Sequence, residues 1–182
     1  MALGVPAAVE RSEGEFRRWL APLGSRATGP GLVVVPVPAE TALPLATPTR
    51  GTAFVDLRPR VSADFPPLPE LEVPEAEPYL VADVDTGADL QDVTPEDALG
   101  RIRAAGRSPL TIAEGVALLL QQPDVLEERN AFSLLGSRGG DRRVPALWTS
   151  RLAGRRGPRL GWCWERNPHP WLGSASCAAR VV

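Results

Sequence analysis

The segment TPEDALGRIRAAGRSPLTIAEGVALLLQQ (94–122) predicts two consecutive helices. The first begins at Thr94, whose hydroxyl can accept a hydrogen bond from the free N–H groups of the first turn, ahead of a proline and two acids. Thr111 and Glu114 have the spacing of a capping box, which predicts the start of the second helix. This second helix is apolar over most of its circumference and ends before Pro123, so we expect it to lie deep in the core.

Short apolar runs on both sides of this helical pair predict strands. The predicted strands cover residues 31–38, 52–59 and 79–87 before the helices and residues 131–137, 144–150, 159–165 and 171–181 after them. Prolines within 31–38 favour an edge position or a strand end, since proline cannot donate to the ladder. Stretches rich in arginine and glycine at 138–143 and 151–158 are predicted loops.

The remaining segments complete a single-domain prediction. Apolar residues recur at helical spacing across 5–23 and predict an N-terminal amphipathic helix within 1–25, which packs on the core or lies on a partner. Six prolines within 59–78 predict an extended connector. We therefore expect one α+β domain with a mixed or mostly antiparallel sheet, an N-terminal helix and a central helical pair, in which residues 129–182 form an Arg/Trp-rich β unit.

The composition excludes several classes of protein. With 182 residues and 43% hydrophobic residues, the chain can bury a substantial core. No apolar run reaches the length of about 20 residues that a membrane helix needs, so we expect no membrane partner. The first residues contain no secretion signal, and two cysteines make no disulfide scaffold. Together these features favour a reducing, cytoplasmic location.

All 20 basic residues are arginine, and they are distributed unevenly along the chain. Residues 1–128 contain 10 Arg and 20 Asp or Glu, whereas residues 129–182 contain 10 Arg and 2 acids. Two explanations follow: the two portions attract each other within the fold, or the basic portion presents a surface to an anionic partner. We favour the first explanation for a chain of this size.

Four of the five tryptophans lie among these C-terminal arginines. Trp162 and Trp164 alternate along a predicted strand, so their rings share one of its faces. Such a pair builds core or lines a cleft, and with guanidinium groups nearby we expect one accessible site for an anionic ligand or a protein partner. Nucleic acid is a less favoured partner, because no recognised nucleic-acid-binding motif accompanies these residues. The predicted ligand-binding residues are Arg138, Asp141, Arg142, Arg143, Trp148, Trp162, Trp164 and Asn167.

Cys163 and His169 are the candidate catalytic residues. An imidazole that takes the proton of a thiol produces a thiolate nucleophile, and two flanking prolines hold His169 in a fixed place. Cys163, His169 and Cys177 do not have the spacing of a common zinc module, so we expect no metal site and no cofactor. Asp83 and Asp85 share a strand face without a third ligand nearby, which favours arginine partners or solvent.

Four longer motifs resemble a family of uncharacterised actinobacterial proteins. The motifs are YLVADVDTG (79–87), GRSPLTIAEGVAL (106–118), NAFSLLGSRGGDRRVPALW (130–148) and LGWCWERNPHPWLGSASC (160–177). The resemblance implies a cytoplasmic protein of actinobacterial origin and implies no particular activity. In this family, cysteine often occupies the positions of Ala131 and Gly139, and its absence here argues against a four-cysteine metal or redox site.

The sequence supports two main hypotheses for function. In the first, the chain is a binding or interaction protein that uses its Arg/Trp-rich C-terminal surface for an anionic ligand or a protein partner. In the second, it is a small enzyme in which Cys163 or His169 acts beside an arginine-bound substrate. A third possibility, a purely structural subunit, predicts that the C-terminal arginines pair with acids of residues 1–128 and leave no pocket.

Overall fold

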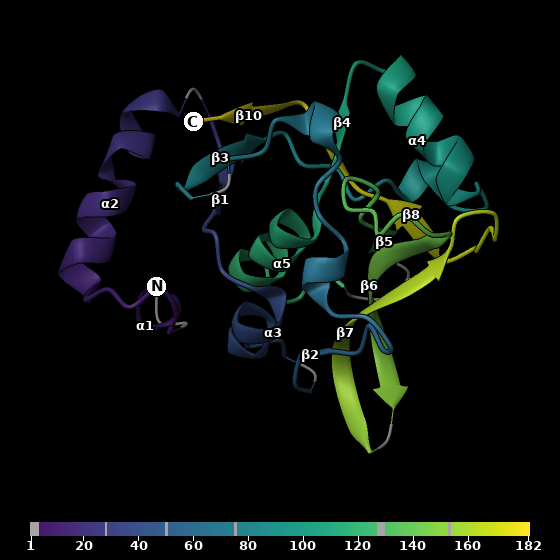
Figure 1. Cartoon of the computed structure of the whole chain (residues 1–182), viewed down its shortest axis with the longest axis horizontal. Helices are drawn as coiled ribbons and strands as arrows, with labels where there is room; N and C mark the ends of the chain where they lie inside the picture. The colour runs from purple at the N-terminus through teal and green to yellow at the C-terminus, as the bar shows by residue number, and fades with distance from the viewer. Residues whose placement is uncertain (1–3, 28, 50, 75, 127–129, 153) are drawn as a thin grey trace.

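Helix α5 (Ile112–Gln121) is the central element of the fold and lies between two β-sheets (Figure 1). The structure is a computed structural model that describes residues 4–27, 29–49, 51–74, 76–126, 130–152 and 154–182. Its main hydrophobic core joins Val116 and Leu119 of α5 to Val81 on one side and Phe132 on the other. The chain is therefore a single α+β domain, as the sequence predicts.

Two sheets and a short strand pair contain all the described strands. The strands are β1 (Gly31–Val34), β2 (Phe54–Val55), β3 (Tyr79–Ala82), β4 (Ser108–Pro109), β5 (Ala131–Ser133), β6 (Arg143–Leu152), β7 (Arg155–Trp164), β8 (Leu172–Ser174), β9 (Ser176–Cys177) and β10 (Ala179–Val181). The first sheet is antiparallel, in the order β1–β3–β10, and the second has the order β2–β7–β6–β5–β8. In the second sheet the β2–β7 and β5–β8 pairs are parallel, which confirms the predicted mixed sheet. Strand β1 lies at an edge of its sheet and ends at Val34, before Pro36 and Pro38, so it is shorter than the predicted strand 31–38.

Both predicted starts of the central helices are confirmed. In α4 (Pro95–Ala104), the hydroxyl of Thr94 accepts a hydrogen bond from the backbone N–H of Asp97 at 3.1 Å. In α5, the Thr111 hydroxyl accepts from the Glu114 N–H at 3.3 Å, and the Glu114 carboxylate accepts from the Thr111 N–H at 2.7 Å. These bonds satisfy donors that have no partner within the helix itself.

The predicted N-terminal helix is instead two helices, α1 (Val5–Ala8) and α2 (Glu13–Arg26). The break follows from local chemistry. Glu10 has a positive φ of 53°, and the Ser12 hydroxyl accepts from the Glu15 N–H at 3.3 Å. The Glu15 carboxylate accepts in turn from the Ser12 N–H at 2.9 Å, so a capping box begins a new helix where periodicity alone predicted continuity.

Short helical segments complete the described structure. They are α3 (Ala39–Ala42), η1 (Leu43–Leu45), η2 (Ser62–Asp64), η3 (Pro69–Leu71) and η4 (Ala88–Leu90). Segments η2 and η3 are short 3-10 helices within the described part of the proline-rich connector 59–78. None of the helices in the described ranges is both long enough and apolar enough to cross a bilayer.

The β6–β7 hairpin is longer than predicted and extends away from the rest of the fold (Figure 1). Its register pairs Arg151 with Arg156, so most of the predicted loop 151–158 is strand, and that prediction was wrong. Arginine and glycine give little signal for a strand, but a ribbon exposed to solvent tolerates both. Residue 153 of the predicted loop 151–158 and residues 127–129, which follow the central helical pair, lie outside the described residues.

A buried ion pair holds the last strand on α5. The Arg180 guanidinium donates to both carboxylate oxygens of Glu114, at 2.6 and 2.9 Å, and also to the Ser108 hydroxyl at 2.5 Å. The Tyr79 hydroxyl donates to the same carboxylate at 3.1 Å. Burial, and then the charge of Glu114, raises the pKa of Tyr79. Both carboxylate oxygens of Glu114 therefore accept hydrogen bonds from donors within the core.

Candidate functional site

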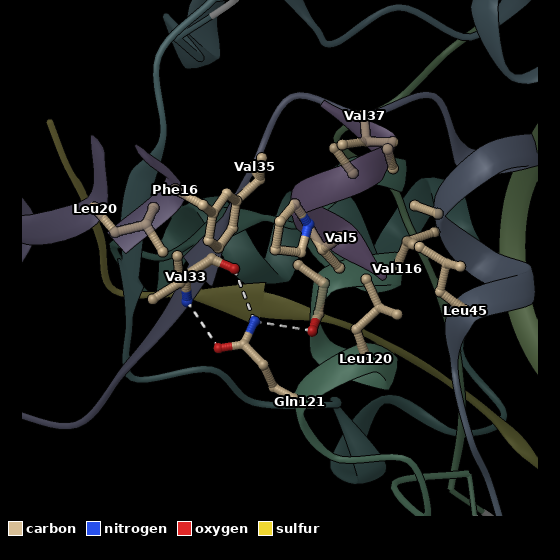
Figure 2. A pocket seen from close by; sticks show the side chains of 15 residues that line it. Val5, Phe16, Leu20, Val33, Val35, Val37, Leu45, Val116, Leu120 and Gln121 are labelled. Atoms are coloured by element: carbon tan, nitrogen blue, oxygen red, sulfur yellow. Dashed lines mark hydrogen bonds between the residues drawn. The ribbon is translucent and has the colours of Figure 1, made fainter. Parts of the chain in front are cut away.

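An apolar cavity lies between the N-terminal helices and the core, and Figure 2 shows its lining. Its volume is about 420 Å³, which is within the usual range of small-molecule sites. Helix α2 contributes Phe16 and Leu20, strand β1 contributes Val33, and α5 contributes Val116 and Leu120. Residues of α1, α3 and η1, together with Val35 and Val37 after β1, complete the wall, so five helical segments, one strand and the segment after it surround the space.

The cavity exists because small side chains face it. On α5, the lining residues Ala113, Val116, Ala117 and Leu120 recur at intervals of three and four, so they form one stripe along the helix. Two of these four are alanine, and Ala42 of α3 is a third small residue in the lining. Larger side chains at these positions would fill the space between α5 and α2.

Gln121 is the one polar side chain among the lining residues. Its carboxamide nitrogen donates to the carbonyl oxygens of Val33 at 2.7 Å and Ala117 at 3.1 Å, and its oxygen accepts from the Val33 N–H at 3.1 Å (Figure 2). Val33 lies in an edge strand, so Gln121 takes the place of a neighbouring strand. Because these polar groups are already paired, the cavity suits an apolar ligand.

No pattern in the sequence predicts this cavity directly. The apolar stripe of residues 5–23 indicated only that a helix packs on the core or on a partner. In the structure, Phe16 is buried while Leu20 is only half-buried, so α2 covers the core incompletely. The one usable signal was the alanine content of the α5 stripe, which leaves room opposite a large aromatic residue.

The fold divides the predicted ligand-binding residues among several places. Those in the β6–β7 hairpin lie on its two faces and are Arg143, Trp148, Trp162 and Trp164, whereas Arg138, Asp141 and Arg142 precede β6 and Asn167 follows β7. On one face the Arg143 guanidinium lies 4.8 Å from the ring centre of Trp162 and 5.5 Å from that of Trp164. On the other face the Arg159 guanidinium lies 4.9 Å from the ring centre of Trp148, its cross-strand neighbour. The fold therefore does not gather these indoles in one site. We call Arg143, Trp162 and Trp164 the Arg/Trp surface.

The arginines predicted to bind an anion already have carboxylate partners. Arg138 lies 2.5 Å from Glu165, and Arg143 lies 2.6 Å from Asp141, measured between nitrogen and oxygen. Arg142 is exposed and lies 3.8 Å from Glu165. Hydrogen bonds from the Arg143 N–H and guanidinium lower the pKa of Asp141. Both carboxylates compete with any external anion for these guanidinium groups.

Arginines of residues 129–182 also pair with acids of residues 1–128. The pairs are Arg159 with Asp56 at 3.2 Å, Arg166 with Glu96 at 2.8 Å and Arg180 with Glu114 at 2.6 Å. These contacts confirm that the oppositely charged portions of the chain attract each other within the fold.

The two candidate catalytic residues have separate surroundings. The Cys163 sulfur lies 4.0 Å from the Ser133 hydroxyl, and burial raises the pKa of this thiol to about 11. The His169 ring centre lies 5.0 Å from that of Trp171, and its Nε2 lies 3.5 Å from the Asn167 amide nitrogen. A thiol that stays protonated at neutral pH is a weak nucleophile, so this geometry does not favour the enzyme hypothesis.

Asp83 and Asp85, which follow β3, have structural partners. Asp83 pairs with Arg107 at 2.7 Å, which confirms the predicted arginine partner. Asp85 accepts a hydrogen bond from the Gly87 N–H at 2.8 Å and shapes the turn. Among the residues that the structure describes, no three His, Cys, Asp or Glu side chains are grouped so that they could hold a metal ion.

These features define a small α+β protein with an apolar cavity beside its central helix and an Arg/Trp surface on its C-terminal hairpin. The chain belongs to the DUF5701 family, a family of unknown function, whose model matches residues 1–182. Neither the curated proteins nor the solved structures include a match to the chain. Membership of this family implies no particular activity, so we infer the function from the geometry of the sites.

Proposed function

We propose that this protein binds a small, uncharged, apolar ligand in the cavity between α2 and α5. The observation that carries the proposal is a space of about 420 Å³ whose lining is apolar except for Gln121. Water in such a space finds few hydrogen-bond partners, so its replacement by apolar groups favours binding. At roughly 30 Å³ per group, the cavity has room for about a dozen carbon-sized groups.

The lining also excludes charged groups from the part of the ligand that enters the cavity. It contains no Asp, Glu, Arg or His side chain. A carboxylate or an ammonium group would therefore lose its hydration without gaining a partner. Medium-length aliphatic chains and small fused aromatic rings fit these requirements, with any polar head group left at the opening.

A fluorescence titration tests the proposal. The probe is 1-aminoanthracene, an uncharged aromatic molecule that becomes brighter in an apolar environment, and decanol is the competitor. The test variant is Ala117→Phe, which places a ring in the cavity from its α5 wall. The matched control is Ala104→Phe, because Ala104 is an exposed residue at the end of α4 and does not line the cavity.

We expect saturable binding of the probe to the unchanged protein and to Ala104→Phe, with displacement by decanol. Ala117→Phe should lose most of this binding while keeping a cooperative thermal transition. If Ala117→Phe binds the probe as well as the control does, the ligand occupies another place and the proposal fails.

A protein partner at the Arg/Trp surface is the second candidate function. Trp164 is 47% exposed, and Trp and Arg are the residue types that most often dominate protein interfaces. The carboxylate partners of the nearby arginines support a protein partner over a free anionic ligand. A partner captured by the unchanged protein should be lost with Trp164→Ala and kept with Trp171→Ala, since Trp171 is 39% exposed but stacks on His169 elsewhere. Equal capture by both variants would reject this surface.

We also propose a cytoplasmic location. Both cysteines are free thiols, as is usual for proteins of a reducing compartment. The all-arginine composition supports an actinobacterial origin, as the resemblance noted in the sequence implies.

A further inference from the structure

The distal half of the β6–β7 hairpin, residues 149–152 and 154–157, carries three exposed arginines. We call this segment the arm. Arg151 and Arg156 are direct cross-strand neighbours, and Arg155 lies next to them with its guanidinium 5.9 Å from the ring centre of Phe54. Like charges that lie directly opposite in a sheet repel each other. The arm therefore concentrates positive charge where the hairpin projects from the rest of the fold (Figure 1).

The arm differs from the rest of the C-terminal portion in how its charge is balanced. Six other arginines of this portion each lie within 4 Å of a carboxylate. The three arginines of the arm have no ion pair with any carboxylate in the described part of the chain. Among the described residues, these three charges thus lie together near one tip without an acidic partner, in a chain that has 22 acids and 20 arginines.

The base of the arm is firmly attached to the fold. The Thr52 N–H donates to the Arg156 carbonyl oxygen at 3.0 Å, so a third backbone segment lies beside β7. Gly157 permits this contact, because a Cβ at this position would lie 2.5 Å from the Thr52 oxygen. The arginines are consequently presented on a two-stranded ribbon with a fixed base rather than on a free loop.

We propose that the arm docks an extended, carboxylate-rich segment of a partner protein. Charge complementarity selects this occupant, since acidic side chains would supply the partners that the fold supplies to the other arginines. A long polyanion is less suitable. Duplex DNA carries a charge about every 1.7 Å and would reach beyond the arm, towards a portion of the chain with 20 acids and 10 arginines. A short acidic segment contacts the arm alone.

Fluorescence anisotropy with two labelled probes tests this inference. The first probe is a short peptide of alternating Glu and Ser, and the second is a short DNA duplex. The test variant combines Arg151→Gln, Arg155→Gln and Arg156→Gln. The matched control combines Arg18→Gln, Arg26→Gln and Arg101→Gln, which removes the same charge from exposed positions outside the arm.

We expect the peptide to bind the unchanged protein and the control, and to bind the arm variant about tenfold more weakly. Binding should also weaken as salt is raised, because the contacts are exposed. The arm variant should unfold at the same temperature as the unchanged protein or higher, since the repulsion between Arg151 and Arg156 is gone.

Three outcomes would overturn the inference. The first is no measurable peptide binding, and the second is equal weakening by the control, which would indicate a general charge effect. The third is tighter binding of the duplex than of the peptide, which would assign the arm to nucleic acid. None of these outcomes bears on the apolar cavity, which lies beside α2 at a different place in the fold.

Discussion

At the scale of single residues, removing one partner of the buried pair of Glu114 and Arg180 should be strongly destabilising. The Glu114 side chain is fully buried and that of Arg180 is 9% exposed, so water cannot replace either partner. We predict that Arg180→Ala lowers the free energy of unfolding by about 3–5 kcal/mol, because it leaves a buried carboxylate without its counter-ion. Urea unfolding measures this change.

Arg17→Ala is the matched control for this prediction. Arg17 pairs with Glu13 at 3.3 Å, but both side chains are about two-thirds exposed, so removal of this pair should change stability very little. If both variants lower the free energy of unfolding by the same amount, loss of the buried pair costs no more than loss of an exposed pair, and the prediction is wrong.

The two thiols give a prediction about pH. Burial raises the pKa of Cys163 and of Cys177 to about 11 from a reference of 9.0. The folded protein thus favours the neutral thiols, and their contribution to stability is complete below pH 9 and lost as the pH rises towards 11. We predict that iodoacetamide labels neither cysteine of the native protein quickly at pH 8, whereas unfolded protein is labelled at both, as mass spectrometry would show. Rapid labelling of native Cys163 would instead revive the enzyme hypothesis.

Whether the sequence predicts a side-chain contact depends on how far apart the two residues lie along the chain. The hydrogen bonds of Thr94 and Thr111 lie within four residues and follow from spacing alone. The contact of Arg180 with Glu114 joins residues 66 positions apart, and no local pattern distinguishes Arg180 from the other arginines. Long-range ion pairs of this kind become visible only when the topology is known.

At the scale of elements, α2 depends on its first turn. We predict that Ser12→Ala lowers the free energy of unfolding by about 1 kcal/mol, because it removes the hydroxyl that caps the Glu15 N–H. Thermal unfolding monitored by circular dichroism measures the change. Ser25→Ala, in the last turn of the same helix, is the control and should have a smaller effect. An equal loss in both variants would show that the capping box is not what begins α2.

The helices that the sequence predicts correctly are those with strong local signals at their first turn. Both central helices have a hydroxyl cap and acids in the first turn, and both begin where predicted. Periodicity predicts one N-terminal helix, but the four residues of α1 and the 14 residues of α2 also satisfy it. The Ser12–Glu15 capping box was present in the sequence, but the continuous apolar spacing concealed it. The arginines and glycines of residues 151–158 predict a loop, because both residue types are poor strand formers. Most of these residues nevertheless form strand, since an exposed ribbon does not require a buried apolar face.

At the scale of the whole molecule, the uneven charge of the chain is partly resolved within the fold. Asp56, Glu96 and Glu114 pair with arginines of the C-terminal portion, as expected if the two oppositely charged portions attract each other within the fold. The candidate site was less predictable than the fold. The arginines and tryptophans were visible in the sequence, but their division between two faces depends on the register of β6 and β7. The cavity depends on how closely α2 approaches α5, which no single segment specifies.

The most direct test of the central claim is methyl NMR of valine- and leucine-labelled protein titrated with decanol. We predict saturable shifts for the methyl groups of Val33, Val116 and Leu120, which line the cavity. The methyl groups of Val61 and Leu152, which lie outside it, should not move. Decanol that shifts none of the cavity methyls, or that shifts the outer methyls equally, would contradict the assignment of the cavity as the binding site.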